Sequence, residues 1–270
     1  MKTTVAAFLT IGCVLAFAGA TAAAVPVTTG GTLVAQWDAS AITGLSDGQA
    51  VTSWADSSGN GTNAGTSGYG AHGTPIYHTN VQNGLAAVWC STYGGADIGD
   101  WFTFSSITPT HVFFVAKDDR PYNTSQSTIM GNSGFHQWDG SGTQIFSYAP
   151  ASTLWTGKLN GASVTLGAAG SRSGLQQAFV LSIDTSASPL ATNSMGNDRN
   201  GYGYRTWAGD YYEVLLYTGT LTAEEENAIG YYLQDKWGLA GAYTQPMPEP
   251  ATMSLLVIGG IAAMIRRKRG

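Results

Sequence analysis

Residues 154–166 read Leu-Trp-Thr-Gly-Lys-Leu-Asn-Gly-Ala-Ser-Val-Thr-Leu, a stretch typical of a β-hairpin. Two short runs, Leu154–Leu159 and Ala162–Leu166, flank the pair Asn160-Gly161. An Asn-Gly pair readily adopts the positive φ angles of a type I′ turn, whose twist matches that of the strands beside it. The stretch therefore predicts two antiparallel strands joined by a tight turn.

The same pattern recurs along the chain. Further Asn-Gly pairs stand at 60–61, 83–84 and 200–201, glycine is abundant, and only 11% of the residues are charged. Many short strands with regular turn signals favour an all-β sandwich of two antiparallel sheets over an α/β fold. The strand-like runs are Thr32–Trp37, Ala50–Trp54, Leu85–Cys90, Trp101–Phe104, His111–Ala116, Gln144–Tyr148, Ser163–Leu166, Gln177–Ile183 and Tyr211–Tyr217.

One helix is expected near the end of this body. Thr222 is a good N-cap, and Glu225 three residues later completes a capping box. Ile229, Leu233 and Trp237 follow at helical spacing as one apolar stripe, and Gly238 ends the pattern. The sequence predicts a helix from about Ala223 to Trp237 that packs against the edge of the sheet.

The first 24 residues are typical of a secretory signal peptide. Lys2 supplies a positive charge, a mainly apolar run follows from Val5 to Phe17, and small residues precede Val25. These features favour cleavage after Ala24, with Ala22 as the alternative. An N-terminal membrane anchor is the competing interpretation, but the run is shorter than the roughly 20 residues that a span needs.

The C-terminus has three consecutive parts, each with its own physical role. The Pro-Glu-Pro motif keeps the chain extended, the apolar run Ala251–Ile265 is short for a stable span, and the basic cluster stops translocation. A plain C-terminal tail anchor would share the last two parts. The motif consists of Pro248, Glu249 and Pro250, and the basic cluster of Arg266, Arg267, Lys268 and Arg269.

This order of parts at the extreme C-terminus resembles the PEP-CTERM sorting signal of Gram-negative bacteria. The resemblance covers residues 248–270 and implies an exosortase-type processing enzyme as partner, a transient membrane anchor, and delivery to the cell surface or extracellular matrix. It carries no information about the function of the protein that is delivered.

The body between the two ends, Val25 to Met247, is strongly acidic. It holds seven lysines and arginines against sixteen aspartates and glutamates, a net charge of −9. Such a surface repels phosphate backbones, so nucleic acid is not an expected partner. Cys90 is its one cysteine, which excludes an intramolecular disulfide in the body and favours a buried thiol.

Two stretches of the body resemble laminin G-like domains of the concanavalin A-like lectin/glucanase superfamily. The first begins at Val34–Ser40 and continues through Asp47–Ala64; the second is Gly209–Tyr217 with the helix that ends at Leu239. The resemblance implies a jelly-roll sandwich of two antiparallel sheets with one C-terminal helix. The chain thus divides into a signal peptide (1–24), a sandwich (25–240), a linker (241–247) and a sorting signal with a short transmembrane segment (248–270).

Glycoside hydrolysis is a known activity of that superfamily, and the residues do not favour it here. Retaining enzymes need two carboxylates about 5 Å apart. Asp210 and Glu213 are three residues apart and fall on opposite faces of a regular strand. No strand-like run carries two glutamates, and no Gly-x-Ser-x-Gly motif is present. We therefore expect no enzymatic activity and no catalytic residues.

Calcium is the one cofactor that the sequence suggests. It takes carboxylate and carbonyl oxygens from loops, and laminin G-like relatives often hold one at the rim of the sandwich. The candidate ligands are Asp56, Asn60, Asp198 and Asp210. The alternative is that Asp56–Gly61 is a polar turn held by Asx caps.

Ligand binding is expected at Tyr202-Gly203-Tyr204-Arg205-Thr206-Trp207. Tyr202, Tyr204 and Trp207 could stack on sugar rings while Arg205 donates hydrogen bonds. Trp207 could instead anchor the loop in the core. The sequence favours a non-enzymatic module that binds glycan or matrix polymer outside the cell. The alternatives are a structural or adhesion protein that contacts matrix proteins and, more remotely, a glycoside hydrolase.

Overall fold

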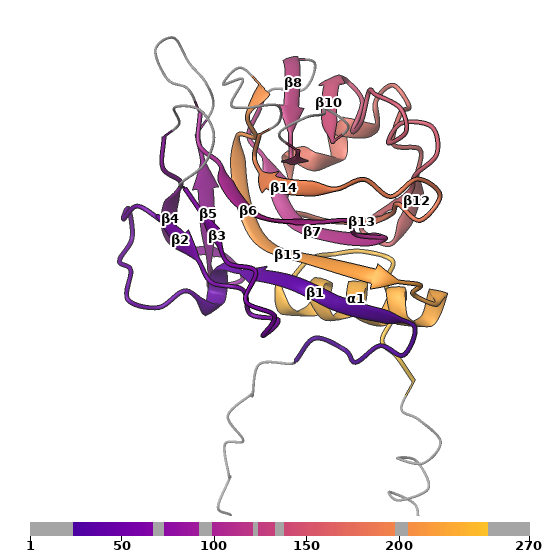
Figure 1. Ribbon diagram of the computed structural model, residues 1–270, viewed down its shortest axis with the longest axis horizontal. Helices are drawn as coiled ribbons and strands as arrows, with labels where there is room; N and C mark the ends of the chain where they lie inside the picture. Colours follow the sequence, from indigo (N-terminus) through magenta and orange to yellow (C-terminus); the bar gives the residue numbers. More distant parts are fainter. Residues whose placement is uncertain are drawn as a thin grey trace, which may run out of the picture.

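A computed structural model of the 270-residue chain describes residues 24–66, 73–91, 99–120, 124–132, 138–197 and 205–247. Residues 1–23 of the predicted signal peptide and the predicted sorting signal 248–270 lie outside this part, as do Asp198, Tyr202 and Tyr204. The described chain is built mainly of antiparallel β-strands with one main helix (Figure 1). The all-β prediction is confirmed at this level.

The larger sheet has eight antiparallel strands arranged around β15. One side of β15 pairs with β7 along its length, and the other pairs first with β5 and then with β1. The strands in spatial order are β12 (Ala162–Val164), β11 (Thr156–Leu159), β13 (Phe179–Asp184), β7 (His111–Asp118), β15 (Gly209–Gly219), β5 (Leu85–Cys90) and β4 (Ile76–Gln82), with β1 (Gly31–Asp38) beside β15.

The smaller sheet packs against the inner face of the larger one. Val88, Phe114 and Leu216 of the larger sheet share a buried core with Phe102 and Met195 of the smaller. The smaller sheet comprises β2 (Ser53–Trp54), β3 (Ala64–Gly65), β6 (Phe102–Ile107), β14 (Thr192–Met195) and β9 (Met130–Gly131); a separate pair joins β8 (Thr124–Thr128) to β10 (Asp139–Gly142). Two 3-10 turns, η1 (Ala39–Ala41) and η2 (Ser171–Gln176), complete the elements.

The turn chemistry is as predicted at two sites. Asn160 and Gly161 have φ angles of 51° and 83° between β11 and β12, and Asn83 and Gly84 have 51° and 73° between β4 and β5. Two predicted strands differ from the structure. Ala50–Trp54 shrinks to β2, and Gln144–Tyr148 forms no strand because the chain turns there, with the Gln144 amide bonded to the Ser141 carbonyl.

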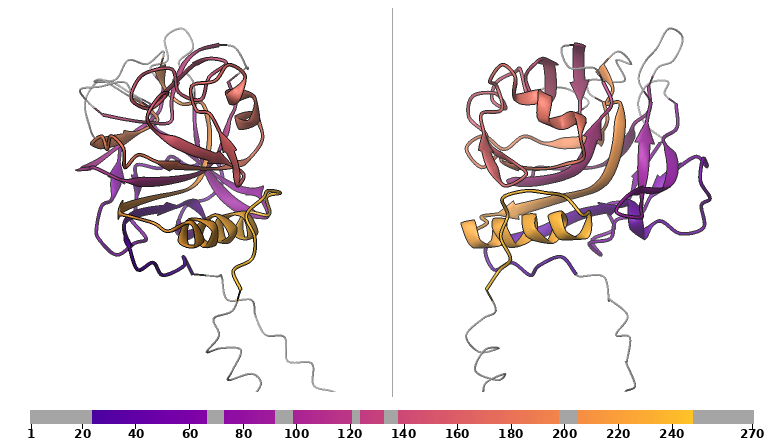
Figure 2. Two further views of the ribbon diagram at one scale, coloured as in Figure 1. Left: turned by 90° about the vertical axis from the view of Figure 1, so that its right-hand side faces the viewer. Right: turned by 180° about the vertical axis from the view of Figure 1, so that it is seen from behind.

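Helix α1 (Ala223–Lys236) begins and ends close to the predicted residues, and its capping box is present. The prediction that it packs against the sheet edge is wrong. Figure 2 shows the helix lying along one face of the large sheet. Ile229 and Leu233 form a second core there with Phe113 and Leu215 of the central strands. The strands β7 and β15 are therefore buried on both faces, which explains their near-continuous apolar sequences.

No helix in the described part of the chain has the length and apolarity to cross a membrane.

Candidate ligand-binding site

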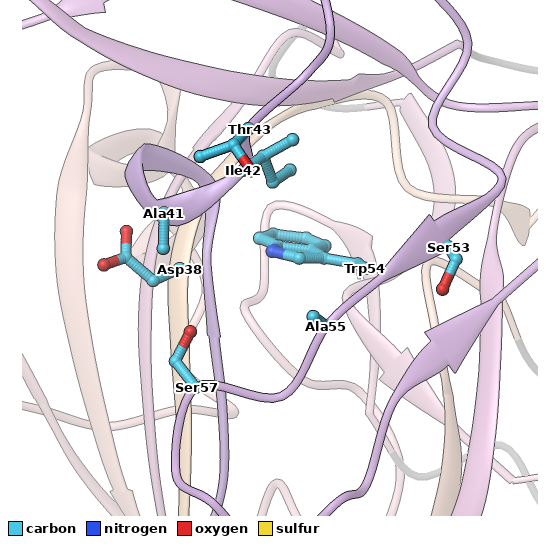
Figure 3. A pocket seen from close by; sticks show the side chains of 8 residues that line it. All are labelled: Asp38, Ala41, Ile42, Thr43, Ser53, Trp54, Ala55 and Ser57. Carbon is cyan, nitrogen blue, oxygen red and sulfur yellow. The ribbon is translucent and has the colours of Figure 1, made fainter.

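An open pocket of about 180 Å³ lies between the end of β1, η1 and the start of the turn that follows β2 (Figure 3). We call it the Trp54 pocket. Its rim carries hydroxyl groups and one carboxylate, and its floor is aromatic. The lining residues are Asp38, Ala41, Ile42, Thr43, Ser53, Trp54, Ala55 and Ser57.

One wall of the pocket is shaped by Asp38 at the end of β1. Its Oδ1 accepts hydrogen bonds from the Ser40 amide at 2.9 Å and the Ser40 hydroxyl at 2.6 Å. The carboxylate therefore caps η1, and η1 turns the chain over the pocket. An aspartate that accepts from the amide two residues on is the usual device for such a turn.

The opposite wall is shaped by Asp56 in the turn after β2. Its Oδ1 accepts from the amides of Gln36 and Ser58, both at 2.9 Å. Its Oδ2 accepts from the Ser58 hydroxyl at 2.8 Å and the Thr62 amide at 2.9 Å. Partial burial would raise the pKa of Asp56, but these hydrogen bonds outweigh it and hold the pKa below its usual range. The turn is thus fixed to β1 in an ionised, hydrogen-bonded form.

Trp54 forms the floor, and its indole N–H, like those of Trp138 and Trp207, is buried. The residue is 1% exposed and its ring meets Phe102 edge-on at 5.7 Å. Its Nε1 has no hydrogen-bond partner. In Figure 3 the nitrogen lies on the side of the ring that faces Ala41 and Asp38. A buried donor without a partner costs about 1–3 kcal/mol, and because the nitrogen has almost no exposed surface, an acceptor in the pocket reaches it only if the ring or the side chains over it shift.

The Asp38 carboxylate also forms an ion pair with a residue of helix α1. Its Oδ2 lies 2.6 Å from the Lys236 ammonium, which contacts Glu213 Oε2 at 2.7 Å. Lys236 is 12% exposed and Glu213 is fully buried. Because one ammonium serves two carboxylates, the orientation of Asp38 depends on the docking of α1.

Glu213 is enclosed by donors on every side. Its Oε1 accepts from Gln36 Nε2 at 2.7 Å and the Tyr232 hydroxyl at 3.1 Å, and its Oε2 accepts from Trp237 Nε1 at 2.8 Å. Burial and the nearby charge of Asp38 raise the pKa of Glu213, and the Lys236 ammonium opposes this rise. The carboxylate is committed to the interface between α1 and the sheet and is closed to solvent.

The expectation that Asp210 and Glu213 lie on opposite faces is wrong. A β-bulge between Tyr211 and Glu213 shifts the register, and both carboxylates face the side of the sheet that carries α1. Burial and the nearby Asp119 raise the pKa of Asp210 to about 6. Neither carboxylate lines the Trp54 pocket, and the burial of Glu213 denies a substrate access to it.

The predicted aromatic ligand site is only partly described. Trp207 is 2% exposed, belongs to the main core and packs on Tyr211 at 5.8 Å. Its ring therefore has no free face for a sugar, so a stacking role for Trp207 is corrected to a core role. Arg205 is half-buried just before it. Tyr202 and Tyr204 lie outside the described residues.

The predicted calcium ligands do not form one site in the described chain. Both oxygens of Asp56 are engaged by amides and a hydroxyl, and Asn60 Nδ2 donates to the Leu33 carbonyl at 2.9 Å. These residues form the polar turn that was the alternative interpretation. Asp210 lies instead beside Lys117 on β15 and β7, and Asp198 is outside the described part. Within the described ranges no three His, Cys, Asp or Glu side chains gather as metal ligands.

Sequence reasoning did not select the residues of the Trp54 pocket. Asp38, Trp54 and Ser57 stand in the stretches that resemble laminin G-like domains, but only as markers of the fold. The sequence does contain a repeated pattern, in which a tryptophan is followed within three positions by an aspartate and a serine. It occurs once at Trp37, Asp38 and Ser40, and once at Trp54, Asp56 and Ser57. Each motif forms one wall or the floor of the pocket.

No protein-family model, curated protein or solved structure matches this chain.

Proposed function

We propose that this chain is an exported, non-enzymatic module that binds neutral glycan in the Trp54 pocket. The observation that carries the proposal is the Trp54 pocket, whose aromatic floor holds a buried indole N–H that has no protein partner and lies on the side of Ala41 and Asp38. Sugar hydroxyls supply both the acceptor that this N–H lacks and donors for the Asp38 carboxylate. The fold proposed with it is the jelly-roll sandwich of laminin G-like domains.

The charge of the body supports a neutral rather than an acidic polymer. Its net charge is −9, and the pocket itself presents Asp38 without a cationic residue in its lining. An anionic polysaccharide would meet like charge on approach to the body, whereas the Asp38 charge in the pocket is compensated by Lys236. The pocket also holds one carboxylate, whereas glycoside hydrolysis needs a pair.

Export is proposed from the two ends of the sequence, and the geometry of the described chain is compatible with it. The segment that follows the signal peptide and the segment that leads to the sorting signal both contact α1. The Thr29 amide donates to Glu225 at 2.5 Å, and the Thr244 amide donates to Asn227 at 3.0 Å. The Ala242 amide also donates to the Asn160 carbonyl at 2.7 Å, so a C-terminal tether would begin beside the β11–β12 turn and leave the β2 end of the sandwich accessible to polymer.

A binding measurement on the full-length chain tests the proposal. The protein should be kept in a polyoxyethylene detergent, because the headgroup of an alkyl glycoside would compete for the pocket. Titration with oligosaccharides of dextran, mannan and galactan should show binding to at least one, and Trp54→Phe should weaken it about tenfold or more, since it removes a desolvated donor worth about 1–3 kcal/mol. Trp37→Phe is the matched control, because the Trp37 N–H is occupied by the Thr62 carbonyl at 3.0 Å.

Two results would overturn the proposal. One is equal loss of affinity in the Trp54 and Trp37 variants, which would indicate a general structural effect. The other is the absence of binding to all three neutral series; self-association under those conditions would favour the matrix or adhesion alternative. Release of reducing ends from any of the polysaccharides would favour a hydrolase.

A further inference from the structure

A second open pocket lies at the other end of the molecule, on the β11–β12 hairpin and the loop before it. Its volume is about 390 Å³, within the roughly 300–1,000 Å³ of small-molecule sites. We call it the Trp155 trough. In Figure 1 β12 and β2 stand at opposite ends of the sandwich, so the trough is well separated from the Trp54 pocket.

The trough is lined by hydroxyl groups and carries no charge. Ser152 and Thr153 stand on one side, Thr156 and the β12 hairpin arm on the other, and none of the lining residues is ionisable. The charged residue of the hairpin, Lys158, is instead paired with Glu226 of α1 at 2.5 Å. Ser163 and Thr165 complete the set of five hydroxyls.

Trp155 gives the trough a rigid base. It is 5% exposed, its Nε1 donates to the Ser188 carbonyl at 2.9 Å, and its ring packs on Trp138 with 4.4 Å between centroids. Gly157 lies beside it, and a Cβ there would lie 2.7 Å from Leu166 Cδ2, so the Leu166 side chain would have to shift. A fixed aromatic base with adaptable hydroxyls around it suits a carbohydrate chain.

The position of the trough favours an extended ligand. Strand β12 is the last strand of the large sheet in the described chain, and its residues Ala162 and Ser163 are exposed. Exposed main-chain groups of an edge strand add further donors and acceptors for a chain that runs past it. A polymer could enter and leave the trough without ending there.

We propose that the Trp155 trough is a second site for neutral polysaccharide, which makes the domain bivalent. The ligand class rests on the proposed function, but the trough does not depend on the Trp54 pocket. Since the two sites lie at opposite ends, one short oligosaccharide cannot fill both. The domain binds two polymer strands, or two distant segments of one, and cross-links the matrix that they form.

The test uses variants that remove hydroxyls but keep shape. The double variant Thr156→Val with Thr165→Val, called the hairpin pair below, keeps a β-branched residue at each of two exposed positions of the hairpin. Thr32→Val with Thr218→Val is the control, because these threonines face each other on β1 and β15 outside both pockets. The readouts are turbidity with high-molecular-weight dextran, mannan and galactan, and titration with their short oligosaccharides.

The wild type and the control pair should cross-link at least one neutral polymer, and alginate should not be cross-linked. The hairpin pair and Trp54→Phe should each abolish turbidity and weaken apparent polymer affinity about a hundredfold, because avidity from two sites is worth about 10²–10⁴. Each should retain one class of oligosaccharide site, and the three substitutions together should remove both.

The outcomes separate the two proposals. If the hairpin pair cross-links polymer as the wild type does, the second site is wrong and the Trp54 pocket stands. If Trp54→Phe alone abolishes every binding signal, the second site is also wrong. If only the hairpin pair affects binding, the proposal of a site in the Trp155 trough is supported and the proposal of a site in the Trp54 pocket is wrong. No binding to any of the three neutral polymers would overturn both.

Discussion

The two tryptophans of the N-terminal region differ in whether the indole N–H has a hydrogen-bond partner in the protein. Trp37 and Trp54 are both buried in the main core, and each is the last residue of a strand-like run in the sequence. The Trp37 N–H donates to the Thr62 carbonyl, whereas the Trp54 N–H has no partner and faces the pocket. Composition and burial alone would not distinguish them.

This contrast predicts different stabilities for matched variants. Replacing either tryptophan with phenylalanine removes the same atoms from the core, so the cavity costs should be similar. Trp37→Phe also leaves the Thr62 carbonyl without its donor, whereas Trp54→Phe removes an unpartnered polar group. Trp37→Phe should therefore be about 1–2 kcal/mol less stable than Trp54→Phe by urea denaturation. Equal stability of the two variants would contradict the assignment of the free N–H.

At the scale of elements, the contact between α1 and the large sheet combines an apolar stripe with a buried charge. Ile229 and Leu233 fill the second core, and Lys236 links Glu213 to Asp38. Breaking a buried ion pair by removing one partner is costly because it leaves the other charge without compensation. Lys236 also lies over the rings of Tyr232 and Trp237, so its ammonium is held in place.

Lys236→Met should destabilise the domain by about 3–5 kcal/mol near neutral pH, measured by urea denaturation. Lys158→Met is the control on the same helix interface; its pair with Glu226 is partly exposed, so its loss should cost less than about 1 kcal/mol. Adding Glu213→Gln to Lys236→Met should restore much of the lost stability. Similar costs for the two lysine variants would show that the Glu213–Lys236 pair is not a buried ion pair.

At the scale of the whole molecule, the stability of the fold is tied to pH through a carboxyl group outside that pair. Burial and Asp119 raise the pKa of Asp210 from 3.8 to about 6. The folded state therefore binds a proton more tightly than the unfolded state does. The contribution of Asp210 to stability is largest below about pH 4 and is lost as the pH rises through about 6.

Asp210→Asn should remove this pH dependence. At pH 7.5 the variant should be more stable than the wild type by up to about 3 kcal/mol, and at pH 4 the difference should vanish. The Asn side chain can still accept the hydrogen bond that the Tyr212 hydroxyl donates to Asp210. Asp235→Asn, which removes the same charge from an exposed helix position, is the control. A gain at pH 7.5 that persists at pH 4 would contradict this assignment.

Features that depend on neighbouring residues could be predicted from the sequence. The Asn-Gly turns, the capping box of Thr222 and Glu225, and the strand Leu85–Cys90 all follow from interactions within a few positions of the chain. Glycine content and short strand-like runs were enough for the all-β class. The local sequence around Asp56 also indicated a polar turn, as one of two interpretations.

The places where these elements meet follow from the packing of the folded chain. Asp38 and Lys236 are 198 residues apart, yet their side chains are 2.6 Å apart at the back of the Trp54 pocket. The bulge that turns Glu213 toward the helix, the placement of α1 on a sheet face, and the burial of Trp207 also depend on partners distant in sequence. No local pattern encodes such contacts, because each is set by how two separately formed surfaces pack together.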